Sequence, residues 1–427
     1  MSTPTRWTCA LTACAIGVIY LVWPWVFRPR GSIVAVTGVS VRGVLPGEFE
    51  SHERLILCWD EDVSRLATQR GVKNHQRTAM SIAVKAAQHA VLTEVVKSTW
   101  DKLPVTVLVQ HDASRKQAEE AFADEGVPAG SVEFEEVPFD TVWVRNFGPL
   151  GVRRSANEQS SKPLWVLADN QFRHRDQDNR FAKILAESFQ VPVLEIPLFL
   201  SGNVLSNGDG LLVTTEHVAE MNRRRGYSRM ELSRILGECF GASQVVFLED
   251  PRQEPNAHVD MFCVFTSADT ILIGEHTGQY DQIDAAIYDR NAELLEQVRT
   301  PNGPLKVVRI PMPARRHHDI WGGTYTNVVF LNKVLLVPTY REIEADLQEQ
   351  FGVGADDVLG ASIHRFHRNP AKIEAILNNP KALPRQATFT FGSTTLETNI
   401  SRIDGAGGEL LGYVVGFSDV SESQRLA

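Results

Sequence analysis

A histidine and an aspartate stand two positions apart in the stretch Asn256–Phe265, which is otherwise mostly apolar. Its alternation predicts a buried strand, on which side chains two apart point to the same face. His258 and Asp260 would then form an acid/base pair on a rigid support, with Cys263 on the opposite face. Taken alone, such a pair is more often structural than catalytic, so its meaning depends on the rest of the chain.

Composition and charge limit the classes of molecule that the protein is expected to bind. The 427 residues include 43 Lys and Arg against 52 Asp and Glu, a net charge of −9 with no basic run, so we do not expect a nucleic-acid partner. An acidic surface suits a cationic small molecule instead. The five cysteines are scattered without CxxC spacing, so we predict no disulfide framework, no metal site and no cofactor.

The first 30 residues differ from the rest of the chain. Trp7–Phe27 carries no charge, lies between arginines and matches the roughly 20 residues that a helix needs to cross a bilayer. We therefore expect residues 1–30 to form a single-pass membrane anchor, which places the protein at a membrane with its orientation open. A cleaved signal peptide and a lipoprotein signal at Cys14 are the alternatives.

Beyond about Gly43, short apolar strands alternate with amphipathic helices. One helix should begin at a capping box formed by Ser228 and Glu231 and end at Gly241. The irregular strand spacing and the tight turns favour an α/β fold of repeated β-β-α-β units around an axis over one doubly wound sheet. Predicted strands are 54–59, 105–109, 164–167, 191–194, 211–215, 244–248, 256–265, 270–273, 305–310, 327–331 and 334–337, and further predicted helices are 80–99 and 115–123.

Five motifs follow one another between residues 44 and 340. They are Leu45-Pro-Gly-Glu-Phe-Glu50 with His52-Glu53, Asp140-Thr-Val-Trp143-Val-Arg145-Asn146-Phe-Gly148-Pro149, Gly202-Asn203 through Gly208-Asp-Gly210 to Thr215-Glu216, His258-Val-Asp260, and Thr324-Tyr-Thr-Asn327 through to Val337-Pro338. Together they resemble the agmatine deiminase and bacterial peptidylarginine deiminase family. The resemblance implies that residues 44–345 form a five-bladed α/β-propeller, the pentein fold.

The resemblance also implies a chemistry and a site. In that family a cysteine thiolate attacks a guanidinium carbon, ammonia leaves, and water hydrolyses the amidino-thioether, while carboxylates hold the cation and a histidine moves protons. His258 and Asp260 match the catalytic positions. The expected ligand is a guanidinium or amine small molecule or peptidyl-arginine, and the substrate-binding segments place Asp140, Trp143, Arg145, Asn146 and Asn203 beside it.

Three departures from the family pattern concern this chemistry directly. Asn146 stands where the resemblance leads us to expect an aspartate, and Leu200 stands where it leads us to expect a glutamate. The family's nucleophilic cysteine belongs near the C-terminus, but no cysteine follows Cys263. Cys58, Cys239 and Cys263 are interpreted as core thiols. We therefore predict impaired hydrolysis; a working amidine hydrolase with an unrecognised nucleophile is the alternative.

Residues 348–427 have a different sequence pattern from the part of the chain before them. Val358–Pro370 and the later runs Leu396–Ile400 and Asp404–Val415 resemble the later part of a PAS sensor domain. This predicts a helix followed by alternating strands in a partial α+β PAS-like segment. The implied alternative function is a PAS-type signalling or ligand-binding protein without enzyme activity, with a PAS-mediated protein partner. The other interpretation is that the tail has no sensing role and merely supplies the strands that close the propeller.

Overall fold

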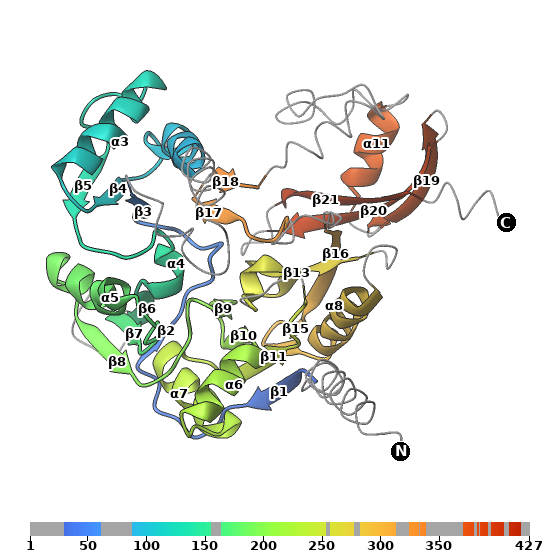
Figure 1. Ribbon diagram of the computed structural model, residues 1–427. Coiled ribbons are helices and arrows are strands. Elements are labelled where there is room, and N and C mark those ends of the chain that lie inside the picture. Colours follow the sequence, from blue (N-terminus) through green and yellow to red (C-terminus); the bar gives the residue numbers. More distant parts are fainter. Residues whose placement is uncertain are drawn as a thin grey trace, which may run out of the picture.

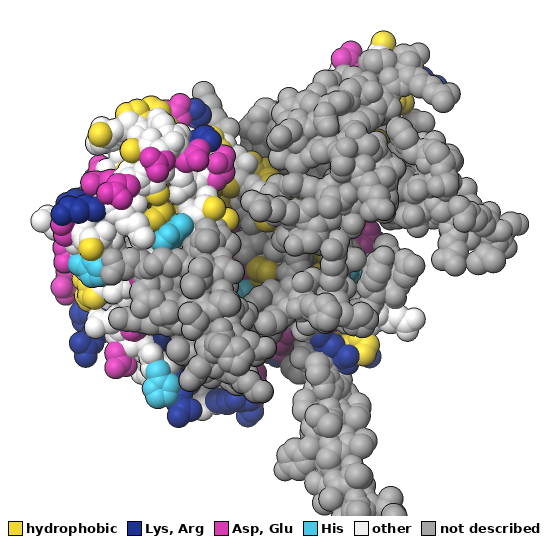
Figure 2. Space-filling view, turned by 45° about the horizontal axis from the view of Figure 1, so that its top comes forward, with side chains coloured by type: hydrophobic (Ala, Val, Ile, Leu, Met, Phe, Trp, Pro, Cys, Tyr) yellow, Lys and Arg dark blue, Asp and Glu magenta, His cyan; other side chains and the backbone are white. Residues whose placement is uncertain are grey.

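Figure 1 shows the computed structural model of the chain, which forms a ring of small sheets with helices around them. The structure describes residues 30–60, 88–154, 164–252, 257–276, 282–312, 324–332, 334–338, 370–379, 382–383, 385–391, 394–404 and 410–419. Side chains of both charges are interspersed on the described surface in Figure 2, where acidic ones gather on the lobe at the upper left.

Three sheets repeat the same β-β-α-β order. In each, two antiparallel strands are followed by helix and then by a strand parallel to the second. The first has β6 (Leu150–Arg154), β7 (Leu164–Ala168), α5 (Asp176–Ser188) and β8 (Val193–Ile196). The second has β9 (Leu205–Ser206), β10 (Leu211–Thr215), α6 (Glu216–Arg224), α7 (Arg229–Phe240) and β11 (Gln244–Leu248); the third has β12 (Cys263–Ser267), β13 (Thr270–Glu275), α8 (Gln282–Glu296) and β16 (Lys306–Pro311). This confirms the predicted repeat.

The N-terminal described segment joins two of these sheets to each other. β1 (Ser32–Ala35) pairs antiparallel with β11, and β2 (Gly43–Val44) pairs antiparallel with β6. A parallel sheet follows, made of β3 (Leu55–Trp59), β4 (Val105–Val109) and β5 (Glu133–Glu136), and it is covered by α3 (Asp112–Asp124) and the helical residues 88–99. The helix predicted over 80–99 is described only in this last part.

Local sequence signals explain α7 well. Ser228 accepts a hydrogen bond from the backbone N–H of Glu231, and the Glu231 side chain accepts one from the N–H of Ser228. Gly241 ends the helix in the left-handed region at φ 74°. Leu232 and Leu236 are fully buried on the face that packs on the core. The predicted capping box and glycine stop are therefore confirmed.

Short hairpins complete the described part of this domain. β14 (Arg299–Thr300) pairs with β15 (Gly303–Pro304), and β17 (Val329–Leu331) pairs with β18 (Val334–Leu336). α4 (Val144–Phe147) precedes β6, and a 3-10 turn, η2 (Val259–Met261), precedes β12. The number of blades remains a prediction.

The predicted strand over 256–265 is wrong in its first half. Ala257 lies in the left-handed region at φ 57°, η2 follows, and the strand β12 begins only at Cys263. The side chain of Asn203 hydrogen-bonds the carbonyl of Ala257 and the N–H of Val259, so these groups do not pair with a neighbouring strand. Polar contacts across the fold thus override the local alternation.

The C-terminal described segment is a helix followed by an antiparallel meander. α11 (Pro370–Leu377) precedes β19 (Arg385–Phe391), β20 (Thr394–Asp404) and β21 (Leu410–Asp419). β21 lies against β16 and β20 lies against β12 (Figure 1), so the meander continues the deiminase-like part. The junction predicted near residue 348 lies outside the described residues, and the PAS-like identity stays a prediction.

The prediction of a membrane location requires correction. Within the described ranges, no helix is both long enough and apolar enough to cross a bilayer. The anchor was predicted over residues 1–30, of which residues 1–29 lie outside the described residues.

Candidate functional site

His258 directly precedes η2 and Asp260 lies within it, and their side chains are close together although the predicted strand is not formed here. The distance from His258 Nδ1 to Asp260 Oδ1 is 3.9 Å, and their side chains are 13% and 5% exposed. Asp260 Oδ1 is buried and has no hydrogen-bond partner among the described residues. The acid/base pair predicted from the sequence is therefore assembled, with one carboxylate oxygen left to accept a hydrogen bond.

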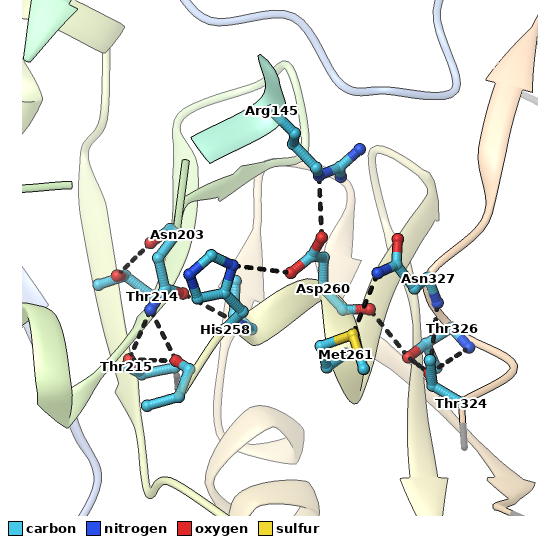
Figure 3. A network of polar contacts seen from close by, with 12 residues as sticks. Arg145, Asn203, Thr214, Thr215, His258, Asp260, Met261, Thr324, Thr326 and Asn327 are labelled. Carbon is cyan, nitrogen blue, oxygen red and sulfur yellow. Dashed lines mark hydrogen bonds and ion pairs between the residues drawn. The ribbon is translucent and has the colours of Figure 1, made fainter. Parts of the chain in front are cut away.

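The other oxygen of Asp260 is occupied by a guanidinium from the same chain. Arg145, on α4, places Nε 2.9 Å from Asp260 Oδ2 and Nη2 2.5 Å from Glu48 Oε1. Figure 3 shows Arg145 reaching down to Asp260 while His258 approaches the same carboxylate from the other side. Two segments far apart in the sequence thus meet at the Asp260 carboxylate, and Glu48 joins a third segment to Arg145.

The electrostatics of this group follow from burial and from the two carboxylates. Burial lowers the pKa of His258; the Asp260 carboxylate opposes this effect and the Arg145 guanidinium adds to it. Burial alone would lower the pKa of Arg145 as well, but Glu48 and Asp260 together raise it. At neutral pH the site therefore holds a charged arginine and a neutral histidine, which can accept a proton.

Asn203 lies beside the loop that carries His258 and is 1% exposed. Its side-chain N–H groups donate to the Ala257 carbonyl at 2.6 Å and to Thr215 Oγ1 at 3.0 Å, and its Oδ1 accepts from the Val259 N–H at 2.9 Å. The amide thus spans the backbone on both sides of His258 (Figure 3). It is directed at the protein backbone rather than at an open space for a ligand.

A tight turn joins the Asn203 side of the site to α4. Ser201 and Gly202 both have positive φ, 51° and 67°, and the N–H of Asn203 donates to the Leu200 carbonyl at 2.8 Å. A Cβ built on Gly202 would lie 2.1 Å from the Arg145 carbonyl oxygen. Only glycine allows this approach, which brings the turn directly against the backbone that carries Arg145.

The segment after residue 323 supports η2 from the opposite side. Thr326 Oγ1 donates to the Asp260 carbonyl at 3.1 Å and lies 2.9 Å from Thr324 Oγ1. The Asn327 side chain donates to the sulfur of Met261 at 3.1 Å. This part of the last motif is therefore placed at the site (Figure 3).

The remaining predicted binding residues lie in different surroundings. Asp140 accepts the N–H of Gln177 at 2.7 Å and so caps α5. Trp143, which precedes α4, is 55% exposed. Asn146 is half-buried; its carbonyl accepts from Asn170 at 3.3 Å, and within the described ranges its side-chain amide has no hydrogen bond. Leu200, at the position where the resemblance leads us to expect a glutamate, is fully buried in the core.

The described cysteines are core thiols, in agreement with their interpretation from the sequence. Cys58, Cys239 and Cys263 are buried and unpaired by disulfides. Burial raises the pKa of Cys58 and Cys263 well above the ordinary value, and that of Cys239 to about 11. None of the three is disposed to form a thiolate at neutral pH.

Sequence reasoning missed Glu48, Thr215 and Thr326 as members of this site. Each lies within a motif that was recognised, so the signal was present at the level of the motif. Their individual roles depend on contacts with residues that are distant in the sequence, such as the 97 positions between Glu48 and Arg145.

Comparisons with known proteins show which family this chain resembles. A profile of the family described as Porphyromonas-type peptidyl-arginine deiminase matches residues 44–351. The agmatine deiminase of Pseudomonas fluorescens is 26% identical over 288 residues, covering 58% of this chain and 75% of its own length. That of Pseudomonas aeruginosa is 26% identical over 351 residues, covering 72% and 87%.

Solved structures show the same fold. The agmatine deiminase of Enterococcus faecalis superposes with a TM-score of 0.56 at 19% identity, covering 75% of this chain and 92% of that chain. The C. jejuni agmatine deiminase gives a TM-score of 0.54 at 20% identity, covering 73% and 88%. The α/β fold of these deiminases is therefore present here, as the resemblance implied.

Proposed function

This chain belongs to the Porphyromonas-type peptidyl-arginine deiminase family, and from this premise we propose that it binds a guanidinium or amine ligand at Asp260 without hydrolysing it. Its relatives are named for agmatine and for peptidyl-arginine, which both carry a guanidinium group. A guanidinium small molecule or a peptidyl-arginine is therefore the proposed ligand class.

The observation that carries binding is Asp260 Oδ1, which accepts no hydrogen bond from the described residues. A buried carboxylate oxygen without a hydrogen bond is costly, and a ligand N–H would satisfy it. The described charges point the same way: Glu48 and Asp260 are acidic, Arg145 is basic, and His258 is neutral at pH 7, which leaves one excess negative charge. A cation complements this site in charge as well as in hydrogen bonding.

The proposal of impaired hydrolysis rests on the thiols. Attack on a guanidinium carbon needs a thiolate above that carbon, but the described cysteines are buried core residues whose pKa is raised. The chain has no cysteine after Cys263. His258 can still accept a proton, but among the described residues no thiol lies where its attack could be assisted by His258.

A second candidate is a PAS-type signalling or ligand-binding protein without enzyme activity. The order of α11 and the strands β19 to β21 supports it, since a helix followed by an antiparallel meander is what the PAS-like resemblance implies. Its distinguishing outcome is the absence of any guanidinium binding at the Asp260 site.

Calorimetry on the full chain tests the proposal. Agmatine and a short peptide containing arginine are titrated into the parent protein and into Asp260→Asn, which keeps the shape but removes the charge. A charge-assisted hydrogen bond contributes about 1.5–3 kcal/mol, so we expect affinity to fall roughly 10-fold to 150-fold. Asp289→Asn is the matched control, because it removes the carboxylate of another arginine pair, the one with Arg309.

Two results would contradict the proposal. If neither ligand binds the parent chain, the site does not recognise a guanidinium, and the second candidate is favoured. If Asp260→Asn and Asp289→Asn bind as tightly as the parent chain, the ligand occupies another place.

A further inference from the structure

The Asn203 side chain uses its hydrogen-bonding groups entirely on the protein. Both N–H donors and the carbonyl oxygen are engaged, by Ala257, Thr215 and Val259. Thr215 Oγ1 also donates to the Ala257 carbonyl at 3.0 Å, so this carbonyl receives two hydrogen bonds. The amide therefore donates to one backbone group and accepts from another, as a neighbouring strand would, and fixes the peptide groups before and after His258.

The fixed segment includes a residue in an unfavourable backbone conformation. Ala257 has φ 57°, and a residue with a Cβ persists there only when its surroundings hold it. The two hydrogen bonds to its carbonyl supply that hold. They are made directly before the chain turns into η2, where His258 Nδ1 lies 3.9 Å from Asp260 Oδ1.

The same turn that presents Asn203 also contacts α4. Gly202, the residue before Asn203, lies against the backbone of Arg145, and the carbonyl of Asn203 accepts from Thr214 Oγ1 at 2.6 Å. One short segment, Leu200–Asn203, therefore adjoins both halves of the site: the helix that carries Arg145 and the loop that carries His258.

We propose that Asn203 is a positioning residue. It holds the loop at Ala257–Val259 so that His258 stays packed beside Asp260, the carboxylate that pairs with Arg145. It acts through the backbone and does not contact the ligand, unlike the substrate-binding role that the family resemblance implied. The effect on ligand affinity rests on the proposed function; the effect on His258 itself does not.

NMR on the full chain, with histidine ring carbons labelled, reads the environment of His258 without any ligand. The His258 signal is identified by its loss in His258→Gln. In Asn203→Ala the loop opens and His258 becomes less buried, so its pKa should rise toward the ordinary value for histidine. Agmatine affinity should fall by about tenfold, equivalent to about 1.4 kcal/mol.

Asn291→Ala is the matched control. Asn291 is 1% exposed and holds the backbone N–H and carbonyl of Glu249 at 2.9 Å each, so it is the same kind of clamp at a different place. Its removal should lower stability but leave the His258 pKa unchanged. Thr215→Val removes one hydrogen bond to Ala257 and the one that Thr215 accepts from Asn203. It should move the His258 pKa in the same direction as Asn203→Ala, by less.

The His258 pKa decides between positioning and general stability. If it is the same in Asn203→Ala, Thr215→Val and Asn291→Ala, Asn203 is a structural residue only and the inference fails. If the pKa moves as expected but the parent chain itself binds no guanidinium, positioning holds and the proposed function fails.

Discussion

Gly202→Ala tests whether the turn at Leu200–Asn203 sets the position of Arg145. The glycine has φ 67°, and the added methyl carbon would lie 2.1 Å from the Arg145 carbonyl oxygen and 3.2 Å from the Asn146 Cα. All of these neighbours are backbone atoms, so the clash cannot be relieved by a side-chain rotation. The turn and α4 must separate.

The magnitude follows from two contributions. Placing alanine in the left-handed region costs about 1–2 kcal/mol. Ordinary contact begins at 3.4 Å, so the methyl group and the carbonyl must move apart by 1.3 Å (3.4 − 2.1), and inserting a methyl into a packed region typically costs about 1–3 kcal/mol. We expect the free energy of unfolding to fall by about 2–5 kcal/mol, with ligand affinity falling as Arg145 moves away from Asp260.

Urea unfolding of the full chain, beside Gly130→Ala, separates the two contributions. Gly130 also has a positive φ, 79°, but nothing lies within 4 Å of its Cβ position. Gly130→Ala should therefore lose only the backbone contribution and keep its ligand affinity. Equal losses of stability in the two variants, within about 0.5 kcal/mol, would refute the close packing of the turn on α4.

Two further predictions concern titration and thiols. Burial lowers the pKa of His52, His217 and His258, so below the unfolded value of about 6.5 the unfolded chain binds more protons than the folded chain. The urea concentration at half-unfolding should therefore decrease when the pH is lowered from 7 to 5.5, and should decrease less in His258→Gln. An equal decrease in both chains would exclude His258 as a contributor. In a chain carrying Cys9→Ser and Cys14→Ser, the remaining thiols should react with a disulfide reagent only after unfolding, and rapid reaction of the folded chain at pH 7 would show an accessible thiolate.

The sequence was sufficient for elements whose signals are local. β4, β10 and β11 have the predicted bounds, because each is a short apolar run that is fully or largely buried. α7 was predicted from its capping box and terminal glycine, which act within a few residues of the helix ends. Asp260 and His258 do lie close together as predicted, but they do so at the turn η2 and not on the strand from which the prediction was made.

The rest depended on contacts between distant residues. η2 replaces the predicted strand because Asn203, 54 positions before Ala257, fixes that carbonyl. The pairing of Arg145 with both Glu48 and Asp260 was equally invisible in local patterns. A motif can identify which residues belong to a site, but only the fold shows that Asp140 caps a helix while Glu48 faces Arg145.

Ammonia release from agmatine by the purified full chain tests the central claim most directly, under conditions in which calorimetry shows the ligand bound. Binding that depends on Asp260, without ammonia above the rate of a sample that lacks protein, is the expected result. Sustained ammonia release that disappears in His258→Ala would show that the site still hydrolyses its ligand, and would contradict binding without hydrolysis.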